Sequence, residues 1–252
     1  MLKRIYFFCA SLFSWLFFGV CALAFNFLCA VLLLLPGRNR LAPVIAGIIR
    51  RYFIIWVGWM RVSGLIRINW RGFADESMRR PAVLVANHPS LLDAVFLLSR
   101  LPGAVCVFKS KLLRNPFLAP AAIMAGYPMG DVGPDFIRTS VRSLVAGRTL
   151  LIFPEGTRTA SGAVLNPVKP GFALIAAKAG VPVQLVTIRA NRSLLPRERK
   201  WWSFLPPFPV TVEICADSRL MIPPDRDARE TATLVQDRLT TALTRSLAST
   251  PA

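Results

Sequence analysis

The only histidine of the chain lies in the stretch NHPSLLD (87–93), and a carboxylate follows it five positions later. His88 and Asp93 can therefore form a hydrogen bond if the chain turns between them. A carboxylate bonded to one imidazole nitrogen fixes the tautomer and leaves the other nitrogen basic. The pair is thus a candidate general base, although a lone histidine in a loop is more often structural.

The proton that this base would remove is not on a neighbouring serine. The chain has no GxSxG sequence of the kind that carries the nucleophile in many hydrolases. Ser90 is only two residues from His88 and is predicted to cap a helix that starts near it, which places Asp93 about one turn into that helix. We therefore expect His88 to act on a hydroxyl group of the substrate.

A second polar stretch, FPEGTRT (153–159), follows the apolar run TLLI. Its proline and glycine favour a turn. Arg158 offers a fork of donors suited to a phosphate, to which Thr157 and backbone N–H groups can add. Glu155 cannot bind a phosphate, and we expect it to hold an arginine or a substrate hydroxyl. Taken alone, the stretch could equally be an ordinary turn with a surface arginine.

Both polar stretches follow short apolar runs that are predicted to be strands. The expected strands are 65–70, 82–87, 104–109, 149–154, 181–188 and 211–215, and the expected helices are 91–100, 114–125, 135–147, 169–180 and 225–247. This alternation predicts an α/β domain with a mostly parallel central sheet flanked by helices. Loops that follow the strands of such sheets carry their sites. Residues 190–209, rich in Arg, Trp and Pro, are predicted to be an irregular surface loop.

The N-terminal segment is predicted to anchor the protein in a membrane. No charged residue occurs from Ile5 to Leu35, and a helix of that length would be about 46 Å long, against about 30 Å for the hydrocarbon core. We expect either one tilted, overlong span or a re-entrant pair of short helices, with Gly19 and Asn26 as candidate break points. A cleaved signal peptide is disfavoured because the run is too long.

A second apolar stretch, 41–66, mixes aromatic residues with Arg50, Arg51 and Arg61. Such a mixture suits the membrane interface better than the bilayer centre, with a buried helix as the alternative. Arginines follow the first apolar run in large number, so the positive-inside rule places that side in the cytoplasm.

The charge balance points to anionic partners. Lys and Arg number 31 and Asp and Glu 13, which gives a net charge of +18. Such a charge attracts nucleic acid, anionic lipid or phosphate-bearing substrates. The basic residues are spread along the chain and form no recognised nucleic-acid motif, so we expect no nucleic-acid partner. Five cysteines without a CxxC pair, together with a single histidine, argue against a zinc site.

The two polar stretches together resemble the conserved blocks of a known family. NHPSLLD matches NHxxxxD and FPEGTR matches EGTR in the glycerolipid acyltransferases, so the chain resembles the lysophospholipid acyltransferase family, which includes the 1-acylglycerol-3-phosphate acyltransferases. The resemblance covers roughly residues 65–215. FKSKLLRNPF (108–117), with Lys109, and KPG (169–171) match weaker blocks. AGYPMGD (125–131) matches poorly.

The mismatch in the poor block concerns one arginine. The family's arginine just after the aspartate is Val132 here. Arg138 or Arg142 could take over its contact. In the family this block takes part in recognising the phosphate head group of the lipid substrate, so the mismatch concerns that recognition.

The resemblance implies transfer of a fatty acyl group from a thioester, on acyl-CoA or acyl-carrier protein, to the hydroxyl of a lysophospholipid. The expected acceptor is 1-acylglycerol-3-phosphate, which would give phosphatidic acid. His88 would be the base and Asp93 its orienting partner. The substrate-binding residues would be Lys109, Glu155, Gly156, Thr157 and Arg158. No metal or bound cofactor is implied.

The resemblance and the apolar N-terminus together predict two parts, membrane-anchoring helices in 1–66 and an acyltransferase domain in 67–252. The expected location is a bacterial inner membrane, with the catalytic domain on the cytoplasmic side. Three alternatives remain: a lyso-ornithine or other lyso-aminolipid acceptor, a membrane-anchored thioesterase that uses the same pair on water, and a non-enzymatic basic membrane or nucleic-acid binder.

Overall fold

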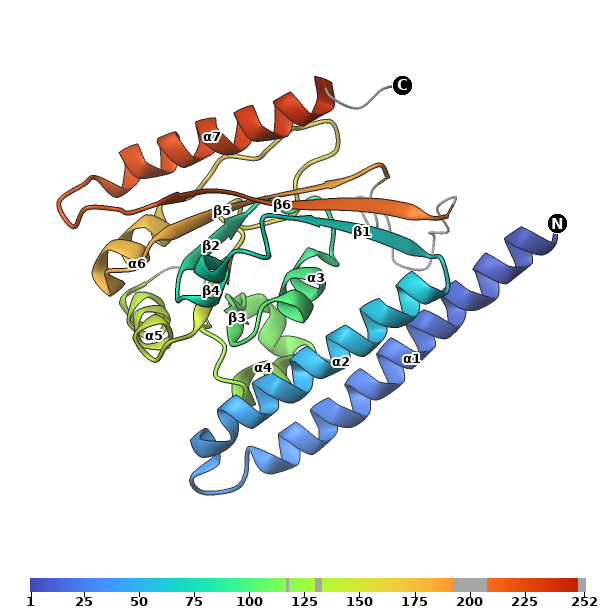
Figure 1. The fold of residues 1–252 in the computed structure, drawn as a ribbon. Helices are drawn as coiled ribbons and strands as arrows, with labels where there is room; N and C mark the ends of the chain where they lie inside the picture. Colours follow the sequence, from blue (N-terminus) through green and yellow to red (C-terminus); the bar gives the residue numbers. More distant parts are fainter. Residues whose placement is uncertain (117, 130–132, 193–207, 249–252) are drawn as a thin grey trace.

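A six-stranded sheet forms the centre of the computed structural model, which describes residues 1–116, 118–129, 133–192 and 208–248 (Figure 1). The strand order is β1-β6-β5-β2-β4-β3. The strands are β1 (Ile66–Arg71), β2 (Val83–Ala86), β3 (Ala104–Cys106), β4 (Thr149–Ile152), β5 (Val183–Ala190) and β6 (Val210–Leu220). Only the β5–β6 pairing is antiparallel among the described strands, so the expected mostly parallel sheet is confirmed.

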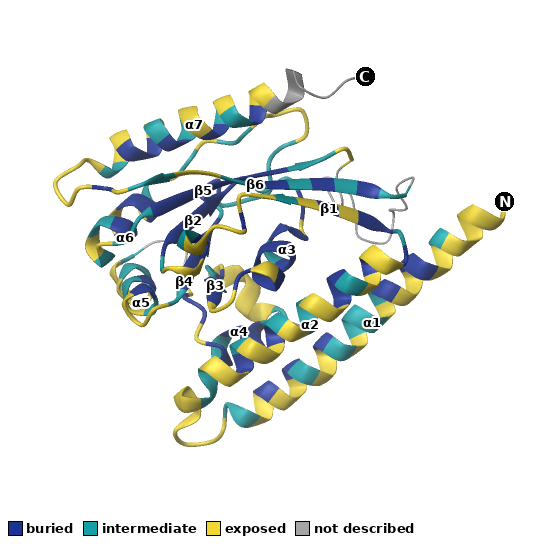
Figure 2. Ribbon diagram, viewed as in Figure 1, coloured by how far each residue is buried: buried dark blue, intermediate teal, exposed yellow. Residues whose placement is uncertain are grey.

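The central strands are covered on both faces. Every residue of β2 and β4 is buried, as a parallel sheet with helices on both sides requires. α7 (Ala228–Ala248) packs on β5 and on α6 (Gly171–Ala179), and α5 (Pro134–Val145) packs on α6 and β4. On the other face lie α3 (Asp93–Arg100) and α4 (Ala119–Met124). Figure 2 shows the buried strands between these layers.

Two expected helices differ from the structure. The predicted helix 114–125 is divided into a 3-10 turn, Ser110–Arg114, and the short α4. Pro116 and Pro120 explain the division, because proline lacks the backbone donor and is tolerated only in the first turn of a helix. The helix expected to start near Ser90 begins instead at Asp93, with Leu92 as its N-cap.

The N-terminus forms a helical hairpin of α1 (Leu2–Leu32) and α2 (Ala42–Val62), joined through a 3-10 turn at Arg38–Leu41. α1 is continuous, as in the alternative of one overlong helix, and the candidate break at Gly19 or Asn26 does not occur. Neither residue removes a backbone donor, and Asn26 donates from its amide to the carbonyl of Ala22 at 2.9 Å, one turn back. The helix predicted in 41–66 is confirmed.

α1 buries small or polar residues and exposes large apolar ones, which is the opposite of an amphipathic helix in a soluble protein. Its buried residues are small or polar, namely Ala10, Ser11, Ser14, Ala22, Asn26 and Cys29. Its exposed large residues are apolar, among them Phe8, Leu12, Phe13, Leu16, Val20, Leu23 and Phe27. Small residues at helix contacts and large apolar residues outside are typical of helices surrounded by lipid. By length and composition, α1 and the segment Arg38–Val62 are each apolar enough to cross a membrane.

Polar contacts join the two helices of the hairpin to each other, and a further one joins the hairpin to the domain. Tyr52 donates to the carbonyl of Phe18 at 2.6 Å, and the Trp56 indole donates to the carbonyl of Ser14 at 3.0 Å. The side-chain oxygen of Asn26 accepts from the backbone amide of Ala121 in α4 at 2.9 Å. α2 also packs along α3, the helix that begins at Asp93. The apolar hairpin therefore packs directly on the helix that carries Asp93, the partner of the candidate base.

Candidate active site

The two polar stretches meet at one edge of the sheet. β2 and β4 are parallel neighbours, so the segments that follow them, 87–93 and 153–159, leave the sheet on the same side. The backbone amide of Thr159 donates to the carbonyl of His88 at 2.8 Å. The sheet topology thus brings together two stretches that are far apart in the sequence.

His88 and Asp93 form the expected pair, with 2.9 Å between Nδ1 and Oδ2. The same carboxylate oxygen accepts from the backbone amide of Ser90 at 2.7 Å. The side chain of Asp93 is 1% exposed and that of His88 is 16% exposed. With Nδ1 engaged by the carboxylate, Nε2 is the nitrogen left to take a proton from a substrate.

The imidazole is also positioned by an aromatic ring. Phe153, which directly follows β4, lies almost parallel to the His88 ring, with 4.1 Å between ring centroids and 19° between planes. A ring stacked on one face and a carboxylate on Nδ1 leave the imidazole little freedom to rotate. Phe153 belongs to FPEGTRT, but its residue type alone does not indicate this contact.

Burial raises the pKa of Asp93, and the hydrogen bonds from His88 and from the Ser90 amide oppose that rise. Its other oxygen, Oδ1, is buried without a hydrogen-bond partner among the described residues. An ionised carboxylate in such a place is costly unless a positive charge forms beside it. The site is therefore suited to stabilise an imidazolium on His88 when that ring takes up a proton.

Asn87 fixes the point at which β2 ends. Its amide donates to the carbonyl of Ile188 at 2.8 Å, and its side-chain oxygen accepts from the Ile188 amide at 2.7 Å. The side chain thus continues the pairing of β2 with β5 after the backbone has turned away. No sequence pattern indicates this role, because the partner lies 101 positions away.

The buried carboxylate of Glu155 links the two polar stretches by hydrogen bonds. One carboxylate oxygen accepts from the backbone amide of His88 at 2.8 Å and from the Thr159 hydroxyl at 2.9 Å. The other accepts from the backbone amide of Asn166 at 2.9 Å. Glu155 is buried, and these protein donors differ from the arginine or substrate hydroxyl expected from the sequence.

Comparison with known proteins agrees with this geometry. A family model described as Acyltransferase matches residues 67–189. A chloroplastic 1-acyl-sn-glycerol-3-phosphate acyltransferase from Brassica napus is 34% identical over 121 residues, 46% of this chain and 35% of that protein. The alpha form of the human enzyme is 35% identical over 162 residues, 57% of this chain and 56% of that protein. Residues 67–189 of the chain therefore match an acyltransferase domain of the kind found in these enzymes.

The fold is also that of a solved member of this family. The 1-acyl-sn-glycerophosphate acyltransferase PlsC from Thermotoga maritima superposes with a TM-score of 0.67 at 22% identity, covering 100% of this chain and 97% of that one. The chain spans about half the length or less of the curated relatives quoted above.

The remaining family-block residues lie around the same edge. Gly156 adopts a φ of +68°, a conformation that favours glycine, and Thr157 and Arg158 are half-buried beside it. Lys109 is exposed and lies three residues after β3, which is parallel to β4. Its position at the carboxyl edge of the sheet follows from this topology, while substrate contact by any of these side chains stays a prediction.

Two predicted segments fall partly outside the described residues. They are 130–132, which includes Val132 of the poorly matching block, and 193–207 of the expected surface loop. Arg138 is one of the two arginines that could take over the contact of the family's arginine after AGYPMGD (125–131). It forms a 3.0 Å ion pair with Asp135, and its side chain is largely exposed.

Asn166 braces the turn from outside the recognised blocks. In addition to its backbone bond to Glu155, its side-chain amide donates to the carbonyl of Arg158 at 3.1 Å. Its side-chain oxygen accepts from the amide of Ala160 at 3.2 Å. Asn166 could not be predicted from the sequence, since an asparagine in a polar loop carries no signal that distinguishes a structural hydrogen-bonding role from a solvated side chain.

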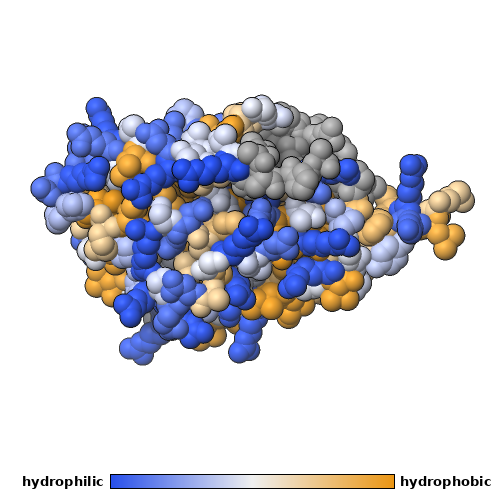
Figure 3. Space-filling model, turned by 45° about the horizontal axis from the view of Figure 1, so that its top comes forward, coloured by the Kyte–Doolittle hydropathy of each residue, from blue (hydrophilic) through white to orange (hydrophobic). Residues whose placement is uncertain are grey.

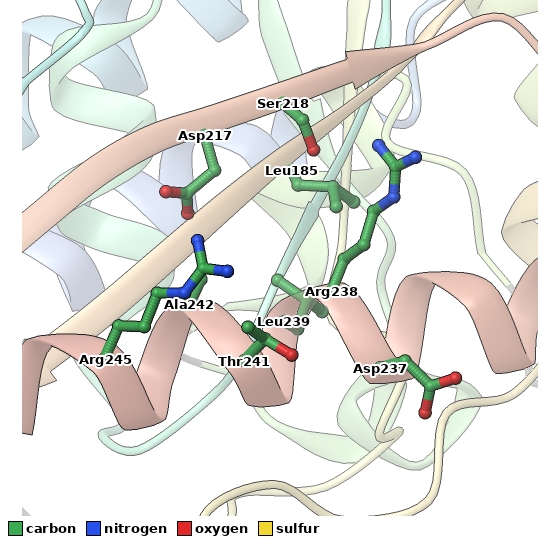
Figure 4. A pocket seen from close by; sticks show the side chains of 9 residues that line it. All are labelled: Leu185, Asp217, Ser218, Asp237, Arg238, Leu239, Thr241, Ala242 and Arg245. Carbon is green, nitrogen blue, oxygen red and sulfur yellow. The ribbon is translucent and has the colours of Figure 1, made fainter.

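A separate hollow lies between α7 and the β5–β6 pair (Figure 4). Its volume is about 420 Å³, and charged side chains of both signs face it, including Asp217, Arg238 and Arg245. None of the residues of the two site stretches lines it. Figure 3 shows hydrophilic side chains spread over one face of the molecule.

Replacing Glu155 by glutamine is expected to lower both stability and activity. A glutamine side chain has a single acceptor oxygen, so either the His88 and Thr159 donors or the Asn166 amide would face an NH₂ group. A buried donor without an acceptor costs about 1–3 kcal/mol, and the loss would loosen the segment that holds His88. Thermal unfolding and acyl transfer measured on the same preparations test this.

The matched control is Glu230→Gln, which changes an exposed carboxylate in the first turn of α7. It is expected to behave as the wild type. Equal unfolding temperatures for the two variants would mean that the Glu155 brace contributes nothing to the site.

Proposed function

We propose that the protein transfers a fatty acyl group from a thioester to the free hydroxyl of a lysophospholipid. The observation that carries this proposal is the His88–Asp93 pair, held beside the FPEGTRT turn by the 2.8 Å bond from the His88 amide to Glu155. Curated relatives named as 1-acyl-sn-glycerol-3-phosphate acyltransferases support that acceptor.

In this proposal Nε2 of His88 takes the proton of the acceptor hydroxyl as its oxygen attacks the thioester carbonyl. The C–S bond then breaks, the ester forms, and the imidazolium returns the proton to the leaving thiolate. Asp93 keeps the proton on Nδ1 and stabilises the imidazolium between these steps. The substrate supplies the nucleophile, so one base is sufficient.

We propose that Arg158, with Thr157, binds the phosphate of the acceptor. A guanidinium can form two parallel hydrogen bonds to a phosphate, and the turn that carries it is braced by Glu155 and Asn166. Phosphate at this turn would leave the acceptor hydroxyl free to approach the adjacent imidazole.

Membrane attachment by the α1–α2 hairpin completes the proposal. The outward apolar surface of α1 is suited to lipid, where the acceptor resides. Arg50 and Arg51 lie near the middle of α2, and charged groups at a bilayer centre are costly. We therefore propose that the hairpin lies along the interface of a bacterial inner membrane, on the cytoplasmic side.

An acceptor panel tests the proposed function. Membranes that contain the protein are given a labelled acyl donor, as acyl-CoA or acyl-carrier protein, with either lysophosphatidic acid or a lyso-ornithine lipid. We expect phosphatidic acid from the first acceptor and little product from the second. Product from the aminolipid alone would overturn the proposal that the acceptor carries a phosphate. The valine at 132, where the family has arginine, would then be the feature to explain.

A further inference from the structure

A lysine from outside the matched EGTR block lies on the FPEGTRT turn. The backbone amide of Lys169 donates to the carbonyl of Pro154 at 3.1 Å. A Cβ added to Gly156 would lie 3.1 Å from Nζ, 3.4 Å from Cε and 3.7 Å from Cδ of Lys169. The lysine side chain therefore runs along the turn, and the missing side chain of Gly156 makes room for it.

Among the described residues, no carboxylate forms an ion pair with the ammonium group of Lys169. Glu155 is the nearest carboxylate in sequence to Gly156, but its oxygens are engaged by amides and by a hydroxyl. Lys169 is exposed, so its charge is available to an anion that reaches the turn.

The surroundings of this ammonium favour an anion. α6 begins at Gly171, two residues after Lys169, so the partial positive charge of its first turn lies nearby. Arg158 follows Gly156 by two residues in the same turn. Since the turn is fastened to His88 through Glu155, an anion held here would lie close to the candidate base.

We propose that Lys169 binds the phosphate monoester of the acceptor lipid together with Arg158. The inference rests on the proposed function and adds to it a residue that determines specificity for a phosphate head group. In sequence terms it adds a cation to a chain that has valine at 132 in place of the family's arginine.

Exchange of Lys169 for glutamine tests the proposal through the kinetics. We expect Lys169→Gln to raise the KM for lysophosphatidic acid about tenfold, with less than a twofold fall in kcat, because a charge-assisted hydrogen bond to the phosphate is lost. Lys169→Arg keeps the charge and is expected to remain within about threefold of the wild type. With a phosphate-free acceptor such as monoacylglycerol, the difference between Lys169→Gln and wild type should disappear.

Lys178→Gln is the matched control. Lys178 is exposed in the last turn of α6, at the end of the helix away from Lys169, and its exchange changes the net charge by the same amount. Equal KM values for Lys169→Gln and Lys178→Gln would overturn the proposal.

Equilibrium binding of a short-chain lysophosphatidic acid separates this inference from the proposed function. Wild type is expected to bind it about tenfold more tightly than Lys169→Gln. If both proteins bind it equally, Lys169 has no role in phosphate recognition, while the acyl-transfer proposal stands. If the wild type does not bind it at all, both proposals fail.

Discussion

Replacing His88 by alanine is expected to lower the turnover of acyl transfer at least ~100-fold, the size of effect typical for removal of a general base. The imidazole is the only histidine ring in the chain, and its Nε2 is the free nitrogen beside the FPEGTRT turn. The rate of diacyl product formation from a labelled thioester is the measurement. The acceptor KM should change much less, because the proposed phosphate contacts come from other residues.

Two further readouts make the His88→Ala result specific. The fraction of protein in the membrane pellet is expected to match the wild type, because the hairpin is unchanged. The unfolding temperature is expected to fall only slightly, because one hydrogen bond to the buried Asp93 is lost. Unchanged turnover would mean that the 87–93 segment has a structural role only. Membrane binding with no transfer by either protein would favour a non-enzymatic membrane binder.

Replacing Asp93 by asparagine is expected to lower turnover by about 100-fold or more while leaving the fold intact. His88 Nδ1 and the Ser90 amide share one oxygen of Asp93, so the asparagine oxygen can take that place and preserve the tautomer. What the substitution removes is the negative charge that stabilises the imidazolium. Single-turnover transfer rates measure the loss.

The stability of the Asp93→Asn variant should not fall. Burial raises the pKa of Asp93 in the folded protein, so the folded state binds this proton more tightly than the unfolded chain does. The contribution of Asp93 to stability therefore decreases as the pH rises above its ordinary pKa, and its charge is a cost at neutral pH. An unfolding temperature well below that of wild type would contradict this description of the carboxylate.

The sheet and the meeting of the two polar stretches could be predicted from the sequence, because both depend on strong local patterns. Short apolar runs such as 83–86 and 149–152 are recognisable as strands, and parallel neighbours place their following loops at one edge. The resemblance to the family blocks then gave His88 and Asp93 their roles.

The braces of the site could not be predicted, because they depend on distant partners. Glu155 and Asn166 act through backbone amides, which have no sequence signature. The start of α3 at Asp93 also escaped prediction, although Ser90 makes capping contacts: its hydroxyl accepts from the Leu92 amide at 3.2 Å, and its own amide donates to the Asp93 side chain. Leu91 and Leu92 form a turn before the regular helix begins. The continuity of α1 also depends on a distant partner. The bond between Asn26 and Ala121 outweighs the low helix propensity of Gly19 and Asn26.

The most direct test of the central claim is thiol release from a labelled thioester donor by the wild type, with and without lysophosphatidic acid. We expect thiol release to require the acceptor, to equal the amount of phosphatidic acid formed, and to fall at least ~100-fold in His88→Ala. Thiol and free fatty acid released at the same rate without the acceptor would show that water is the nucleophile, and would contradict an acyltransferase in favour of a thioesterase.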